Sequence, residues 1–128
     1  MSSEPRLRIG LAQLNFLVGD AQGNAARVIE SVARARTGLA PDLLLFPELT
    51  LSGYPPEDLL FHGGFRHSIQ RALDTVRDAV RGMGVIVGYP EYVGPDIYNS
   101  AALLCDGALI ANHRKRERNP DPQGTIPQ

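Results

Sequence analysis

Apolar residues occupy every second position of residues 7–11, and Arg8 and Gly10 lie between them. This period of two predicts a strand with one buried face. A second apolar run, residues 43–46, is continuous and ends at Pro47. Such a run is typical of a strand that is covered on both faces, as in a parallel sheet with helices packed on it. The two patterns predict two β-strands.

Two longer stretches carry apolar residues at spacings of three and four, which predicts helices over residues 24–37 and 65–81. Gly38 lies at the usual position of a helix terminator, and Gly82 and Gly84 end the second stretch. The two apolar stripes consist of Ala25, Val28, Ile29, Val32 and Ala35 in the first helix, and of Phe65, Ile69, Ala72, Leu73, Val76 and Val80 in the second.

A third apolar run, residues 85–87, predicts another strand. Residues 101–105 and 108–112 then flank the dipeptide Asp106-Gly107, which is a strong indicator of a two-residue hairpin turn. The predicted order is therefore β-α-β-α-β followed by a hairpin, an α/β fold.

Beyond Lys115 the pattern ends. Prolines and a glycine interrupt the remaining residues, in which Ile126 is the one aliphatic side chain outside the prolines. We expect a domain over residues 1–117 and a disordered tail over residues 118–128. A chain of 128 residues has room for one modest core.

The composition of the chain excludes several classes of protein and of site. Hydrophobic residues make up 43% and charged residues 21% of the chain, as in a globular protein. A net charge of −1 offers no field for nucleic acid, and no stretch is long and apolar enough for a signal peptide or a membrane span. A single cysteine, Cys105, can form no internal disulfide and belongs to no zinc-site spacing. We expect a cytoplasmic protein with a small-molecule partner.

Glu48 is the first candidate for chemistry. It follows an apolar strand, and in open α/β sheets ligands bind at the carboxyl ends of the strands. A carboxylate shielded from water there should have a raised pKa, towards the range useful for a general base. Taken alone, however, the position also suits a capping or surface carboxylate.

The neighbouring residues make a resemblance visible. Phe46-Pro47-Glu48 followed by Ser52-Gly53-Tyr54 is similar to the segment that carries the catalytic glutamate of the nitrilase, or carbon-nitrogen hydrolase, superfamily. Residues 54–59 look like its glutamine-dependent NAD synthetase branch. Further matching parts are Gln13, Val18-Gly19-Asp20, Asn24, Tyr98-Asn99-Ser100-Ala101 and His113-Arg114-Lys115.

The resemblance implies about half of a nitrilase-type α-β-β-α sandwich, and a glutaminase domain that converts L-glutamine to glutamate and ammonia. It makes Glu48 the general base, Lys115 the cation that stabilises the tetrahedral intermediate, and Tyr54 a wall or hydrogen-bonding group of the glutamine pocket. It implies no cofactor and no metal in this chain, because ATP is used by a separate synthetase domain to which the ammonia passes.

In that family a cysteine beyond the lysine is the nucleophile. Cys105 precedes the hairpin turn and is expected to pack as a small apolar residue. We therefore expect a glutaminase domain truncated before its nucleophile and inactive alone. Two alternatives remain open: another nitrilase-branch amidase, or a non-catalytic pseudoenzyme or interaction fragment. Unfilled sheet edges would favour association, so a homo-oligomer is expected.

Overall fold

The computed structural model describes residues 6–55 and 57–115. The strands are Ile9–Leu11 (β1), Leu43–Leu45 (β2), Gly84–Val93 (β3), Asp96–Cys105 (β4) and Ala108–Arg114 (β5). The helices are Ala21–Thr37 (α1), Glu57–Leu60 (α2) and Gly63–Ala79 (α3). The predicted boundary after residue 117 and the predicted tail lie outside the described residues.

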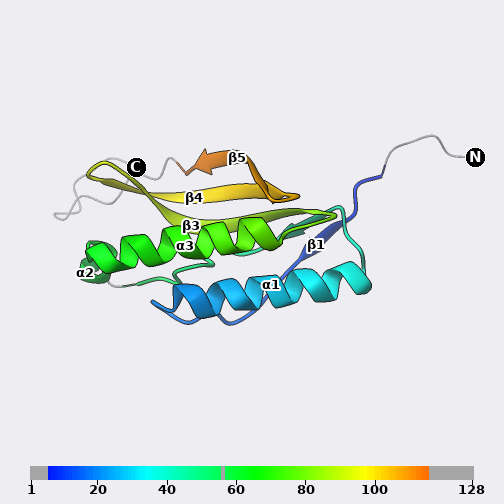
Figure 1. Cartoon of the computed structure of the whole chain (residues 1–128), viewed down its shortest axis with the longest axis horizontal. Helices are drawn as coiled ribbons and strands as arrows, with labels where there is room; N and C mark the ends of the chain where they lie inside the picture. Colours follow the sequence, from blue (N-terminus) through cyan, green and yellow to red (C-terminus); the bar gives the residue numbers. More distant parts are fainter. Residues whose placement is uncertain (1–5, 56, 116–128) are drawn as a thin grey trace, which may run out of the picture.

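In the described part of the chain the strands form one sheet, in the order β1-β2-β3-β4-β5. β1, β2 and β3 run parallel, whereas β3, β4 and β5 run antiparallel. Asp106 and Gly107 join β4 to β5 with φ angles of 48° and 80°, the left-handed pair that a type I′ hairpin turn requires. The predicted α/β class and hairpin are confirmed, and the predicted element order holds except for the short helix α2, which the prediction missed (Figure 1).

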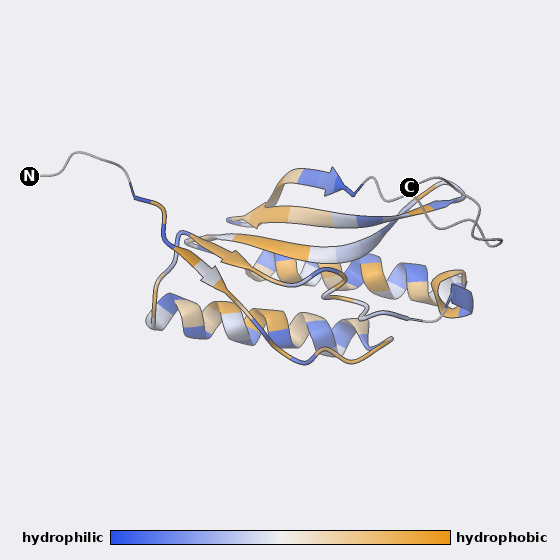
Figure 2. Ribbon diagram, turned by 180° about the vertical axis from the view of Figure 1, so that it is seen from behind, coloured by the Kyte–Doolittle hydropathy of each residue, from blue (hydrophilic) through white to orange (hydrophobic). Residues whose placement is uncertain are grey.

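Helices α1 and α3 lie on the same side of the sheet, and the core fills the space between them and the strands (Figure 1). Every apolar stripe residue predicted for α3 is buried. In α1, Val28 and Val32 are buried as predicted, but Ile29 and Ala35 are partly exposed, and Ala21 and Asn24 are buried in addition. Along both helices hydrophobic and hydrophilic segments alternate (Figure 2).

Helix α1 begins one turn earlier than predicted. The Asp20 carboxylate accepts a hydrogen bond of 3.0 Å from the backbone N–H of Gly23 and so caps the first turn. Apolar spacing locates the core-facing part of a helix, whereas a capping side chain sets its start. The prediction missed the first turn because it began at the apolar stripe.

The prediction for β1 is wrong about which face is buried. Gly10 faces the helices and is buried, while Leu7, Ile9 and Leu11 are 66%, 52% and 71% exposed. β2 likewise buries Leu44 against the helices and leaves its neighbours partly exposed, so it is not covered on both faces by the described residues. A glycine buries its backbone against neighbouring apolar groups, so apolar alternation alone did not indicate the inner face.

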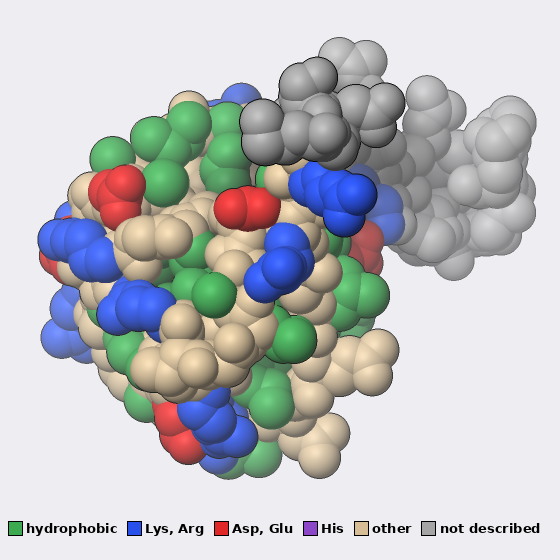
Figure 3. Space-filling view, turned by 90° about the vertical axis from the view of Figure 1, so that its right-hand side faces the viewer, with side chains coloured by type: hydrophobic (Ala, Val, Ile, Leu, Met, Phe, Trp, Pro, Cys, Tyr) green, Lys and Arg blue, Asp and Glu red, His purple; other side chains and the backbone are tan. Residues whose placement is uncertain are grey.

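No helix among residues 6–55 and 57–115 combines the length and the apolar character needed to span a bilayer. At the end of the molecule shown in Figure 3, Lys and Arg side chains are spaced among hydrophobic ones and do not gather in a single basic patch.

Candidate active site

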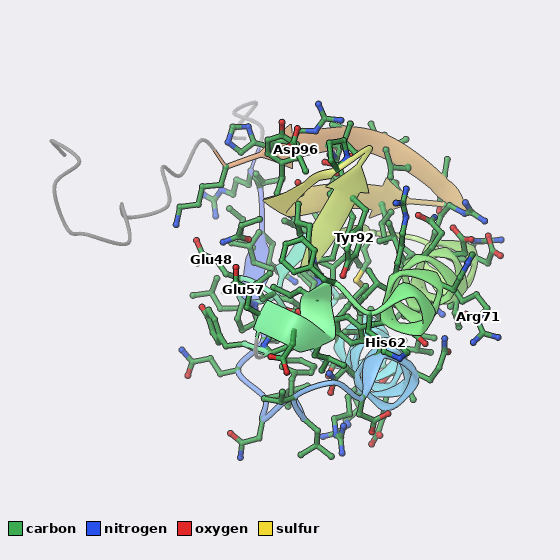
Figure 4. The ribbon with its side chains drawn as sticks, turned by 90° about the vertical axis from the view of Figure 1, so that its left-hand side faces the viewer. Glu48, Glu57, His62, Arg71, Tyr92 and Asp96 are labelled. Atoms are coloured by element: carbon green, nitrogen blue, oxygen red, sulfur yellow. The ribbon has the colours of Figure 1, made fainter. Side chains whose placement is uncertain are left out.

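Glu48 lies just beyond β2, at the end of the sheet beside α2 (Figure 4). Before it, the backbone N–H of Phe46 donates a 2.9 Å hydrogen bond to the carbonyl of Ile86 on β3, which prolongs the pairing of β2 with β3. The chain then turns off the sheet at Pro47. Glu48 is therefore presented at the carboxyl end of a parallel strand, where the sequence placed it.

The turn that carries Glu48 is held by its own hydrogen bonds. The Thr50 hydroxyl donates to the carbonyl of Pro47, and the N–H of Gly53 donates to the carbonyl of Leu49 at 2.7 Å. Leu49 has a φ of 51°, a left-handed conformation that is unfavourable for a branched side chain. Strained backbone next to a reactive side chain is a common feature of functional sites.

Gly88 on β3 allows this turn to lie directly on the sheet. A Cβ atom at Gly88 would lie 2.5 Å from the backbone nitrogen of Leu49 and 2.9 Å from the Cα atom of Glu48. The Gly88 carbonyl also accepts a 3.2 Å hydrogen bond from the N–H of Leu51. The position of Glu48 thus depends on the absence of a side chain at Gly88, because any Cβ atom there would collide with the turn.

Gly88→Ala is expected to destabilise the chain by about 1–3 kcal/mol, because the atoms a methyl group would meet are backbone atoms that move only with the whole turn. Urea unfolding followed by circular dichroism measures the change. Gly63→Ala is the matched control, since a Cβ there would meet nothing within 4 Å. Equal stability of the two variants would contradict the close packing of the turn on β3.

The side chain of Asn24, on α1, forms hydrogen bonds to the turn that carries Glu48 and to the loop after β1. It accepts a 2.8 Å hydrogen bond from the N–H of Leu17 and donates to the carbonyls of Leu17 and Leu51, at 2.8 and 3.1 Å. Asn24 is fully buried, so these bonds form away from water. One side chain of α1 therefore ties the loop after β1 to the turn that carries Glu48.

Lys115 follows the last residue of β5 and reaches across to this turn. Its ammonium Nζ atom lies 2.8 Å from Oε1 of Glu48, and its backbone N–H donates to the carbonyl of Asn99 on β4 at 2.8 Å. The side chains of Glu48 and Lys115 are 50% and 44% exposed. The structure brings together the two residues that the sequence assigned to catalysis, 67 positions apart.

The expected raised pKa of Glu48 is wrong. The hydrogen bond from Lys115 and the charge of its ammonium hold the pKa of Glu48 below its ordinary value and outweigh the opposing effect of burial, and Asn99 adds a smaller lowering effect. The prediction assumed a carboxylate shielded from water, whereas this one is half exposed and paired with a cation. Glu48 is therefore ionised at neutral pH and able to accept a proton.

A cavity of about 330 Å³ adjoins this pair. Its lining consists of Phe46, Pro47, Glu48, Ile86, Gly88, Asn99, Ser100, Ala101, His113 and Lys115. It combines apolar residues with a carboxylate, an ammonium, an amide, a hydroxyl and an imidazole, which suits a small polar ligand with an apolar stem. A smaller cavity of about 220 Å³ between β1 and α1 is lined by no carboxylate.

Two residues discussed from the sequence lie outside this cavity. Tyr54 is 71% exposed and does not line it. Cys105 lies at the far end of β4, four residues from Ala101, a rise of roughly 13 Å. Burial and the neighbouring Asp106 carboxylate raise the pKa of the Cys105 thiol, which disfavours the nucleophilic thiolate.

Sequence reasoning gave no role to Asn99 and Gly88, which contact Glu48 or its turn. Asn99 belongs to the quoted segment that leads into the hairpin, and its proximity to Glu48 follows only from the β3–β4 register. Among residues 6–55 and 57–115, no group of three or more His, Cys, Asp or Glu side chains is placed to hold a metal ion.

Known proteins similar to this chain in sequence agree with the resemblance to the carbon-nitrogen hydrolases. The carbon-nitrogen hydrolase family model matches residues 8–126. A glutamine-dependent NAD(+) synthetase from Xanthomonas campestris pv. campestris is 46% identical over 111 residues, which cover 87% of this chain and 20% of the relative. The enzyme of the same description from Thermotoga maritima is 41% identical over 112 residues, which cover 86% of this chain and 19% of the relative.

Solved structures show the same arrangement. A glutamine-dependent NAD+ synthetase from Acinetobacter baumannii superimposes with a TM-score of 0.80 at 29% identity, over 94% of this chain and 22% of that one. An amidase from Nesterenkonia sp. superimposes with a TM-score of 0.73 at 26% identity, over 90% and 44%. The predicted partial nitrilase-type fold is thereby confirmed. The chain spans about a fifth of the length of the curated relatives that it matches.

Proposed function

This chain belongs to the carbon-nitrogen hydrolase family, and from that premise we propose that it forms part of a glutaminase site that supplies ammonia for NAD synthesis. The observation that carries the proposal is the 2.8 Å contact between Glu48 and Lys115 beside a cavity of small-molecule size. The sequence relatives named glutamine-dependent NAD(+) synthetase support glutamine as the substrate.

In the proposed reaction Glu48 is the general base. The carboxylate is ionised at neutral pH and can take the proton from an attacking thiol, and the ion pair with Lys115 that lowers its pKa also lowers its proton affinity. The thiolate then adds to the carboxamide carbon of glutamine, and the carbonyl oxygen becomes an oxyanion. When the C–N bond breaks, Glu48 returns the proton to the leaving nitrogen, ammonia departs, and a thioester remains for water to hydrolyse.

Lys115 has the complementary role. An ammonium fixed beside the cavity stabilises the negative charge that develops on the carbonyl oxygen, and it also keeps Glu48 ionised before the reaction. Asn99, which lines the cavity beside Glu48 and helps to lower its pKa, is assigned the role of orienting the carboxylate. These groups come from the end of β2, from β4 and from the end of β5, so the site assembles only when the sheet is complete.

The proposal assigns the nucleophile to none of residues 1–128, because Cys105 lies roughly 13 Å along β4 from the cavity and its pKa is raised. This chain contributes the base and the cation. Tyr54, which the resemblance made a wall or hydrogen-bonding group of the glutamine pocket, does not line the cavity beside Glu48 and is given no role in it. ATP use is assigned to a synthetase domain distinct from these residues.

A hybrid enzyme tests the proposal. Residues 8–115 of this chain replace the matching segment of the Xanthomonas campestris relative, a substitution made practicable by 46% identity. The hybrid enzyme is expected to release ammonia from L-glutamine and to prefer it to short aliphatic amides. A soluble, folded hybrid enzyme without glutaminase activity would contradict the proposal, and a preference for aliphatic amides would favour the amidase alternative.

The 128-residue chain alone is the matched control. It is expected to release no ammonia from L-glutamine above background, with or without Cys105→Ala. Ammonia release that disappears in Cys105→Ala would show that this thiol is the nucleophile after all.

A further inference from the structure

β5 brings Lys115 to Glu48, yet β5 is poorly held by packing. All of its residues are exposed, within the described part of the chain it pairs with β4 alone, and that pairing is irregular between Leu103 and Leu104. Edge strands with few buried contacts open locally at low cost in free energy. Something other than apolar packing must therefore hold the end of β5.

Glu91 on β3 provides this hold from two strands away. Its Oε1 atom accepts hydrogen bonds of 2.8 Å from the Ser100 hydroxyl on β4, 3.0 Å from the Asn112 amide and 2.8 Å from Nε of Arg114, both on β5. Its Oε2 atom lies 3.4 Å from the second nitrogen of Arg114. One carboxylate thus joins β3, β4 and β5.

This cluster is more sheltered than its surface position suggests. The Glu91 side chain is 19% exposed, and the Arg114 guanidinium lies 5.2 Å from the centre of the Tyr98 ring. Burial raises the pKa of Glu91, but the hydrogen bonds from Arg114, Ser100 and Asn112 outweigh it, so the pKa lies below its ordinary value. A sheltered, charge-assisted contact of this kind is stronger and more directional than an exposed ion pair.

Apart from Ser100, which lines the cavity and also donates to Glu91, the cluster and the candidate active site use side chains on opposite faces of the sheet. His113 and Lys115 line the cavity, whereas Arg114 between them points to Glu91. Because side chains alternate along a strand, fixing Arg114 on one face also fixes the direction in which Lys115 leaves on the other. β3 carries both Glu91 and Gly88, so both partners of the catalytic pair are positioned against the same strand.

We propose that Glu91 is a positioning residue that holds Arg114, and through it Lys115, at the Glu48 carboxylate. The proposal deepens the proposed function, on which it rests for the catalytic meaning of the pair. The test of the positioning role does not measure catalysis, so an inactive hybrid enzyme would contradict the proposed function without contradicting the role of Glu91.

The test is an NMR titration of the Glu48 carboxyl in the 128-residue chain, in the wild type and in Glu91→Gln. If Glu91 positions Lys115, the variant loosens the ion pair and the pKa of Glu48 rises towards its ordinary value. If Glu91 acted only through its charge, removing a nearby negative charge would lower the pKa of Glu48 instead. The two explanations therefore differ in sign, and an unchanged or lowered pKa overturns the proposal.

Hydrogen exchange gives a second readout. The Lys115 amide, which donates to the Asn99 carbonyl, is expected to exchange about tenfold faster in Glu91→Gln, whereas core amides such as that of Val28 keep their rates. Glu30→Gln is the matched control, because it removes a carboxylate from an exposed ion pair with Arg34 on α1. It should change neither the Glu48 titration nor the Lys115 exchange rate.

If Glu91→Gln fails to fold, Asn112→Ala decides the question. At an exposed position and with no change of charge, it removes one hydrogen bond to Glu91 and the 2.6 Å hydrogen bond that the Tyr89 hydroxyl donates to the Asn112 side chain. A rise in the pKa of Glu48, smaller than that expected for Glu91→Gln, supports the proposal. No rise overturns it. His113 lines the same cavity and is kept in every variant, so its charge is common to all the titrations.

Discussion

Glu48→Gln is expected to lower kcat of the hybrid enzyme for glutamine by roughly 10²–10⁴-fold, because the amide has nearly the shape of the carboxylate but cannot accept a proton. The loss should fall on turnover, since the substituted side chain still fills the same volume beside the cavity. Steady-state ammonia release over a range of glutamine concentrations separates kcat from KM.

The control for this variant is Glu57→Gln, a carboxylate at the start of α2 that does not line the cavity. It should keep full activity. Circular dichroism should show the same fold in both variants. Wild-type turnover in Glu48→Gln would remove Glu48 from the role of base and, with it, the chemical argument for a glutaminase.

Lys115→Met is expected to lower kcat of the hybrid enzyme by roughly 10²–10³-fold through loss of oxyanion stabilisation. It should also shift the pH profile. Lys115 lowers the pKa of Glu48, so without it that pKa rises. A base works only above its own pKa, and the acid limb of kcat/KM should therefore move to higher pH.

Lys115→Arg separates the two effects. The guanidinium keeps the positive charge and should hold the acid limb close to its wild-type position, while its different shape lowers turnover. The profile of log(kcat/KM) against pH, measured for both variants, gives the comparison. An acid limb that stays in place or moves to lower pH in Lys115→Met would show that Lys115 does not control the ionisation of Glu48.

Sequence reasoning succeeded where one element supplied all the information. The stripe on α3 predicted which residues are buried, and Asp106-Gly107 predicted the turn, because helical spacing and turn dihedrals are local properties. It failed for β1, whose inner face is marked by Gly10 rather than by its apolar residues. That outcome depends on which side the helices take, and no single strand contains that information.

The sequence identified Glu48 and Lys115 as residues of the site, but it did not predict the direction in which the pKa of Glu48 is shifted. Glu48 and Lys115 were recognised from separate segments, yet the sign of the Glu48 pKa shift depends on a 2.8 Å contact between residues 67 positions apart. Glu91 was missed for the same reason. Its partners on β5 are reached across β4, and only the strand register shows that a glutamate on β3 lies beside Arg114.

The sequential strand order has a consequence for folding kinetics. β3, β4 and β5 are joined by tight turns, and hairpins of this kind form within about 1–10 μs. The parallel pairing of β2 with β3 must instead close a loop that contains α2 and α3, and such non-local pairings form more slowly. The meander that carries Lys115 should therefore form before the turn that carries Glu48 docks on it. Formation of the Glu48–Lys115 ion pair should accordingly mark a late step in refolding.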